Sequence, residues 1–212
     1  MRAAGGTDYP NAQHRFEPLD VETFRTVQQS IISYIQSEYV YGPAESTASC
    51  ASFLALRSSS KSPFLSVLRN KFSHTLTLFF LCTYVEHWPT FFTDLFSLLR
   101  VAESSSQPKF NRHVSLLLFH LILEISGEVA DQTIKSARTF NPVRHTRDAR
   151  VRDAVRERDA SLINEAVLTI IADGAERMAI LRKSDDVESK TLGDLVEVVD
   201  WGVRTFGSYV GT

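Results

Sequence analysis

The chain has 212 residues, of which 43% are hydrophobic, so it can bury a real core as one domain or one continuous helical array. Its formal net charge of -2 excludes a globally basic nucleic-acid binder, although it permits a local basic surface. Only two cysteines, Cys50 and Cys82, occur, which argues against a disulfide framework and for a reducing compartment. Neither a signal peptide nor an apolar run of membrane-spanning length is present, so we expect a soluble, intracellular protein with no membrane contact.

The first predicted element is an amphipathic helix that follows a polar, disordered lead-in at residues 1–18. Asp20 is its expected N-cap, and Gly42-Pro43 is its expected stop. Residues 44–63 are rich in serine and are expected to form a flexible surface insert. The helix has apolar residues every three or four positions, which predicts a core-facing stripe of Val21, Phe24, Val27, Ile31, Tyr34, Ile35 and Tyr39.

Residues 68–99 organise the chain. They start with the polar triplet Arg69-Asn70-Lys71, continue through an apolar band, break at Trp88-Pro89 and resume as a second apolar segment. Because proline disfavours helical geometry in the residue before it, we predict two helices that meet at a tight corner. Thr90 and Asp94 suit the first turn of the second helix. The prediction is an antiparallel pair with Trp88, Phe91 and Phe92 as core between its arms, and with Arg69 and Lys71 at a helix N-terminal corner.

Three further helices are predicted, at residues 111–137, 160–183 and 192–210, with loops at 103–108 and 184–189. Gly174 is expected to permit close approach of a neighbouring helix. His113 and His120 have no ligand partners at metal-binding spacing, so we interpret them as side chains of a packed helix and predict no metal site. The inward residues are expected to be Val114, Leu117, Leu118, Leu121, Ile122, Ile125, Val129 and Ile134, then Leu162, Ile163, Ala166, Val167, Ile170, Ile171, Ala175 and Met178, then Leu195, Val198, Val199, Trp201, Val203 and Phe206.

An arginine-rich segment precedes the second of these helices and allows two interpretations. Its acids can pair with the arginines at i,i+3 and i,i+4, which is typical of a solvated, salt-bridged helix face. Alternatively, the planar guanidinium groups suit bidentate contacts to phosphate, and Arg147, Arg150 and Arg158 could share one side of the helix. The RNA-binding candidates are Arg144, Arg147, Arg150, Arg152, Arg156 and Arg158, interleaved with Asp148, Asp153, Glu157 and Asp159.

Motifs for nucleotide binding, metal hydrolysis or nucleophilic catalysis are absent: the sequence has no GxGxxG, GxxxxGK[ST], HExxH, CxxC or GxSxG. Carboxylate pairs such as Asp185-Asp186 fall in loops or on charged helix faces, without an apolar setting that would tune a pKa. We therefore expect no enzymatic activity and no cofactor. Apolar helices alternating with short polar corners predict an all-α fold, an α-α superhelix of HEAT-like repeats over residues 19–212 that is a fragment of a longer array.

The stretch LRNKFSHTLTLFFLCTYVEHWPTFFTDLFSLL resembles the exportin-type segment of importin-β-like nuclear transport receptors, the karyopherins. The matching residues are Arg69, Asn70, Lys71, Tyr84, Trp88, Pro89, Phe91, Phe92, Asp94 and Leu95. Within that superfamily, the segment RDAVRERD and the closing Trp201…Tyr209-Val210-Gly211 are most similar to the exportin-T family of tRNA export receptors.

The resemblance implies binding of tRNA together with Ran in its GTP form, on the concave face of a superhelix, and shuttling between nucleus and cytoplasm by contact with nuclear pore proteins. The chain departs from such receptors in being far shorter, in lacking most of the N-terminal repeats that grip Ran, and in its serine-rich insert. Two alternatives stay open: a helical-repeat scaffold that binds Ran, a pore protein or a protein cargo without RNA contact, and a truncated, non-functional exportin product.

Overall fold

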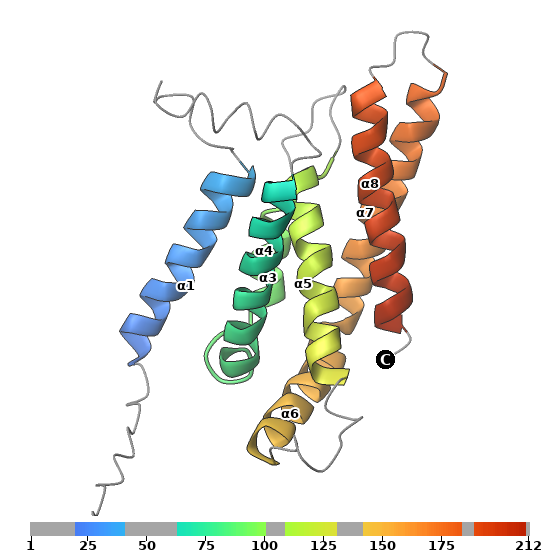
Figure 1. Cartoon of the computed structure of the whole chain (residues 1–212). Helices are drawn as coiled ribbons and strands as arrows, with labels where there is room; N and C mark the ends of the chain where they lie inside the picture. Colours follow the sequence, from blue (N-terminus) through green and yellow to red (C-terminus); the bar gives the residue numbers. More distant parts are fainter. Residues whose placement is uncertain (1–19, 41–62, 101–108, 131–141, 184–188, 211–212) are drawn as a thin grey trace, which may run out of the picture.

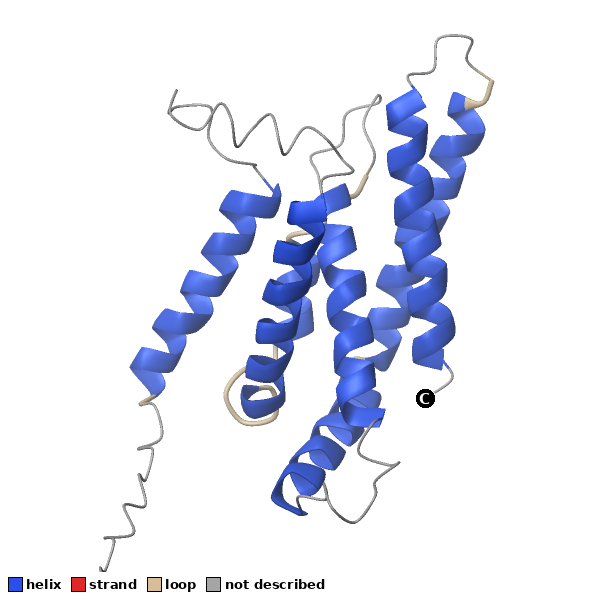
Figure 2. Cartoon of the chain, viewed as in Figure 1, coloured by secondary structure: helices blue, strands red, loops and turns tan. Residues whose placement is uncertain are grey.

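The computed structural model describes residues 20–40, 63–100, 109–130, 142–183 and 189–210. Within these ranges every regular element is helical, and one isolated bridge pairs Arg100 with Phe110, so the all-α prediction is confirmed (Figure 2). The predicted lead-in, most of the serine-rich insert and the loop at 103–108 lie outside the described residues. None of the described helices has the length and apolar character that crossing a membrane requires.

The helices form two layers (Figure 1). Helices α1, α3, α5 and α8 stand side by side, α4 and α7 lie behind them, and α6 packs against α3, α5 and α7. Helices α3, α5 and α8 run in one direction, and α7 runs in the opposite one, as antiparallel helix pairs of a solenoid do. The elements are α1 (Val21–Ile35), the π-helical turn η1 (Gln36–Val40), α3 (Pro63–Thr83), α4 (Phe91–Ser97), α5 (Arg112–Ala130), α6 (Pro142–Arg158), α7 (Ala160–Leu181) and α8 (Ser189–Val210).

Helix α1 begins at its predicted cap, because Asp20 Oδ1 accepts a hydrogen bond of 2.8 Å from the backbone N–H of Thr23. Its apolar stripe is less buried than predicted: Phe24 is buried, but Val21 is 70% exposed and Tyr34 is 47% exposed. Within the described residues α1 meets α3 through aromatic side chains, among them Phe24, whose ring stacks 5.6 Å from that of Phe79.

Helix α3 begins five residues earlier than predicted, at Pro63. Proline suits the first helical turn because its missing N–H would have no partner there in any case. Arg69-Asn70-Lys71 therefore lies inside the helix, and the prediction that this triplet forms an N-terminal corner was wrong.

The corner between α3 and α4 forms as predicted around aromatic side chains. Trp88, Phe91 and Phe92 are at most 1% exposed, and the ring of Phe80 on α3 lies 4.7 Å from that of Phe91 on α4. Asp94 fastens the corner, since its Oδ2 accepts hydrogen bonds from Trp88 Nε1 at 2.7 Å and from Thr90 Oγ1 at 2.9 Å. The same oxygen accepts a longer bond of 3.3 Å from a glutamine of α1, so one carboxylate connects three segments.

Helix α5 is enclosed between α3 and α8, which explains why apolar residues occupy almost its whole circumference. Its predicted inward residues are buried from Val114 to Val129, whereas Ile134 lies outside the described residues. On α8, Leu195 and Val198 are buried as predicted, but Val203 is 55% exposed. Ala175 of α7 is likewise exposed rather than inward.

Glycines set the distance between α7 and α8. A Cβ atom on Gly174 would lie 2.7 Å from Val199 Cγ2, and one on Gly202 would lie 2.6 Å from Ile171 Cγ1. Real Cβ atoms do not approach other carbons so closely, so each helix uses a glycine where the partner's branched side chain crosses it. The predicted role of Gly174 is confirmed, and Gly202 plays the reciprocal role on α8.

We expect Gly202→Ala to lower the free energy of unfolding by about 1–3 kcal/mol, because the added methyl group overpacks the α7–α8 contact. Gly193→Ala is the matched control on the same helix: nothing lies within 4 Å of its added Cβ, so alanine should stabilise α8 by about 0.5–1 kcal/mol. Urea unfolding followed by circular dichroism measures both changes. Equal shifts in the two variants would contradict the packing role.

Candidate nucleic-acid interface

Helix α6 carries the six candidate arginines and is anchored by a short apolar side. Val151 and Val155 are 1% and 7% exposed and face the core. Asp148 beside them is 1% exposed, although the sequence placed it on a charged face. The buried side of α6 is therefore defined by Val151, Val155 and Asp148, and the arginines lie on the rest of its circumference.

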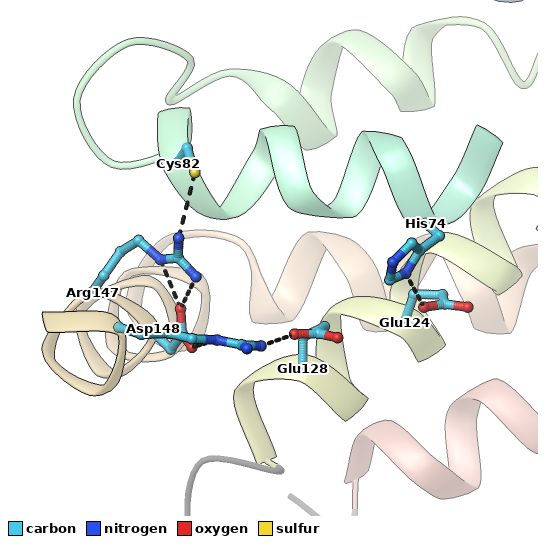
Figure 3. A network of polar contacts seen from close by, with 7 residues as sticks. His74, Cys82, Glu124, Glu128, Arg147 and Asp148 are labelled. Carbon is cyan, nitrogen blue, oxygen red and sulfur yellow. Dashed lines mark hydrogen bonds and ion pairs between the residues drawn. The ribbon is translucent and has the colours of Figure 1, made fainter. Parts of the chain in front are cut away.

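Arg147, Arg150 and Arg158 all reach the end of α3 and the turn that follows it. Arg147 Nη1 lies 3.4 Å from Cys82 Sγ (Figure 3), Arg150 Nη2 lies 3.0 Å from Glu86 Oε1, and the Arg158 guanidinium lies 4.5 Å from the centroid of the Tyr84 ring. The prediction that these three arginines share one side of a helix is confirmed. That side is directed at the α3–α4 corner of the protein itself.

Asp148 pairs with two guanidinium groups, those of Arg147 and Arg144. Arg147 Nη2 is 2.7 Å from Asp148 Oδ1, and Arg144 Nε is 3.4 Å from Asp148 Oδ2, the predicted i,i+4 pairing. Arg144 also pairs with Glu128 of α5, so the network joins α6 to α5 (Figure 3). Because a buried carboxylate without partners costs several kcal/mol, Asp148 depends on these arginines.

Arg152 and Arg156 lie elsewhere on the helix. Arg152 Nε is 3.5 Å from Asp153 Oδ1, and the two side chains are 35% and 59% exposed. The side chain of Arg156 is exposed. Arg152 thus pairs with its neighbour on α6, whereas Arg147, Arg150 and Arg158 contact the α3–α4 corner.

Helices α6 and α7 meet at Asp159, whose backbone forms a hydrogen bond with each of them. Asp159 N–H donates to Val155 O of α6 at 2.9 Å, and Ile163 N–H of α7 donates to Asp159 O at 2.8 Å. The Asp159 side chain is 8% exposed and accepts a hydrogen bond from the Tyr84 hydroxyl. Burial, reinforced by this bond, raises the pKa of Tyr84 well above its usual value, so the phenol stays a donor. The expectation that the aspartates of this segment lie on a charged face was wrong for Asp148 and Asp159, which are both buried.

A second polar cluster joins the start of α5 to α8. Arg112 at the start of α5 pairs with Glu197 of α8 and lies 3.3 Å from Asp194. Burial lowers the pKa of Arg69, and the charge of Glu197 opposes that effect. Arg69 is thus a half-buried side chain, while its neighbours Asn70 and Lys71 are exposed.

His120 behaves as the packed side chain that the sequence predicts. Its ring lies 4.2 Å from that of Trp201. Burial, aided by the charge of Arg69, lowers its pKa to about 4, against the opposing charge of Glu197. Within the described ranges, no group of three or more His, Cys, Asp or Glu side chains is placed to hold a metal ion.

The profile of the Exportin 1-like protein family matches residues 65–202, from the first turn of α3 to the middle of α8. The chain belongs to this family. The predicted exportin resemblance and HEAT-like helical fold are therefore confirmed. No solved structure matches the chain significantly.

Relatives of this exportin 1-like chain include fungal proteins named Exportin-T. The one from Coprinopsis cinerea is 61% identical over 199 residues, which is 94% of this chain and 17% of that protein. The one from Laccaria bicolor is 60% identical over 200 residues, again 17% of its length, and the one from Pyricularia oryzae is 24% identical over 191 residues. The chain thus spans about a sixth of the length of the relatives it matches.

The aromatic residues of the exportin-like stretch and Asp94 have structural roles in this chain. Trp88, Phe91 and Phe92 fill the corner, and Asp94 binds the indole N–H. Tyr84 binds the α6–α7 junction through Asp159. The motif therefore identifies the family because it specifies how consecutive helices pack.

Tyr84→Phe should lower the free energy of unfolding by about 1–3 kcal/mol, because it leaves the buried Asp159 carboxylate without its donor. Tyr34→Phe is the matched control: that side chain is 47% exposed, and its change should stay within about 0.5 kcal/mol. Urea unfolding measures both. A stability of Tyr84→Phe equal to that of the wild type would show that the bond contributes nothing.

His120 predicts a loss of stability in acid. The folded protein holds the pKa of this imidazole near 4, below the value of about 6.5 in an unfolded chain, so the unfolded state binds more protons as the pH falls from about 6.5 to 4. We expect the urea midpoint of the wild type to drop over this range more than that of His120→Gln. An NMR titration of the imidazole checks the pKa directly, and parallel pH profiles of the two proteins would refute its role.

Proposed function

We propose that this chain is a segment of a nuclear export receptor that binds tRNA together with Ran in its GTP form. The observation that carries the proposal is the 61% and 60% identity to two proteins named Exportin-T, over 94% and 93% of the chain. The segment acts by binding rather than by catalysis. Its further partners are nuclear pore proteins, and the receptor moves between nucleus and cytoplasm.

The character of α6 supports RNA as a partner. The chain as a whole is slightly acidic, yet α6 concentrates six arginines within 17 residues. Recognition by such a surface is driven by phosphate charge and RNA shape, so its affinity falls steeply with salt.

The alternative is a helical scaffold that binds proteins without touching RNA. The observation in its favour is that Arg147, Arg150 and Arg158 are directed at the α3–α4 corner of the chain itself. A pull-down with Ran loaded with GTP or GDP tests for a transport role, which the tRNA export receptor and a Ran-binding scaffold would share. A receptor segment should prefer the GTP form, whereas a scaffold unrelated to transport should ignore the nucleotide.

The decisive experiment is a titration of labelled tRNA with the chain, with and without Ran-GTP. We expect saturable binding that weakens roughly tenfold or more between about 50 and 200 mM salt, as the release of counterions from two or more phosphates requires. A DNA duplex of similar length is the control for unspecific charge attraction and should bind more weakly. Absence of saturable tRNA binding under both conditions would contradict the proposal.

A further inference from the structure

Helices α7 and α8 leave apolar side chains exposed along their shared length. Leu168 of α7 is 47% exposed, and Val196 and Val203 of α8 are 48% and 55% exposed. Ala175 of α7 is exposed as well. In each helix the two residues are seven positions apart, so at 100° per residue they lie within about 20° of each other around the helix. We call these four residues the outer face.

The two valines of α8 lie on the side of that helix opposite α5. The ring of Trp201 lies 4.2 Å from that of His120 of α5, and Asp194 lies 3.3 Å from the first residue of α5. At 100° per residue, Trp201 and Asp194 lie about 140–180° round the helix from Val196 and Val203. The valines are therefore directed away from α5.

The exposed residues of α7 lie on the same side of the helix pair. Helix α7 meets α8 at Gly174 and Ile171. Ile170 lies on the flank of this contact that is nearer to α5, because it lines a cavity together with residues of α5. Measured from the middle of the contact, Ile170 lies about 70° round α7 in one direction, and Leu168 and Ala175 lie about 70–90° in the other.

The antiparallel course of the two helices brings the four residues together in pairs. Counted from the two glycine contacts, Leu168 lies beside Val203 and Ala175 lies beside Val196, each pair within about two residues, or roughly 3 Å, of the same level. Exposed charged residues lie farther out on both helices, about 40–100° round from these pairs. They are Glu165 and Glu176 on α7, and Asp200 and Arg204 on α8. An apolar centre with charged edges suits the apolar side of an amphipathic helix.

The chain's own architecture indicates which helix that is. In the layer formed by α3, α5 and α8, α5 has a neighbour on each side, whereas the structure describes no helix on the far side of α8 (Figure 1). In a solenoid each repeat buries its apolar side on its neighbours. The matched segment is 17% of the Coprinopsis and Laccaria proteins, so most of their length lies outside it.

We propose that, in a receptor of that length, the helix pair that follows α8 packs on the outer face, at the place that α5 takes on the other side of α8. The proposal rests on one part of the proposed function, namely that the chain is a segment of a larger receptor. It does not depend on tRNA or Ran, so loss of tRNA binding and loss of this contact are separate results.

The test compares this chain with a chimera in which the chain replaces the matching segment of the Coprinopsis protein. Single cysteines are introduced by Val203→Cys or Leu168→Cys, and peptide mass spectrometry follows how fast a maleimide labels them. Both should react about tenfold or more slowly in the chimera than in the chain, because the contact must open first. Leu78→Cys is the control: Leu78 is 45% exposed on α3, a helix within the array, so its rate should be the same in both proteins.

Val196→Asp/Val203→Asp provides a second measurement. In the chimera it should return the labelling of Leu168→Cys to the rate seen in the chain, and the unchanged rate of Leu78→Cys shows that the rest stays folded. The proposal is overturned if Val203→Cys reacts equally fast in both proteins, or if the two aspartates leave Leu168→Cys protected. It is also overturned if dilution of the chain alone accelerates labelling of Val203→Cys, since a second copy would then be the occupant.

Discussion

Tyr84 is the side chain on which the arrangement of the described helices depends most. It is fully buried, its ring stacks 4.5 Å from that of Phe80, and its hydroxyl donates to Asp159 at the junction of α6 and α7. Arg158 covers the same ring. The aromatic corner between α3 and α4 therefore fixes the position of the junction between α6 and α7. Because burial keeps the phenol protonated, this donor is constant across physiological pH.

The fixed junction determines which arginines are available to a partner. Asp159 lies between the end of α6 and the start of α7 and makes a backbone hydrogen bond to each helix, so the bond from Tyr84 fixes where the two helices meet relative to the α3–α4 corner. Val151 and Val155 then face the core, and Arg147, Arg150 and Arg158 face α3. Removing the Tyr84 donor alone is costly because it leaves the buried carboxylate unpaired, whereas the intact pair adds little stability over an apolar pair of the same shape. Its main effect is to select one packing of apolar helices among several that bury similar area.

The fold was largely predictable because periodicity and helix-stop signals are local. The cap at Asp20, the corner at Trp88 and the role of Gly174 all follow from residues close in sequence. What could not be predicted depends on distant partners. Val203 matches the apolar period of α8 but is 55% exposed in the folded chain, and Arg69 looks like a surface charge until Glu197 is brought near it.

The roles of the α6 arginines likewise could not be predicted from sequence, because they depend on partners that are distant in the chain. The sequence contains six candidate arginines and allows two interpretations of them, a salt-bridged face or a phosphate-binding face. In the sequence these interpretations are alternatives for the whole segment. The structure shows that the first interpretation describes the side of α6 that meets α3 and α5, because Asp148, Glu128, Cys82, Glu86 and Tyr84 occupy those guanidinium groups. Removing Arg144 or Arg147 would take a partner from the buried Asp148 and weaken the packing of α6, so a loss of RNA binding after such a change would report on folding.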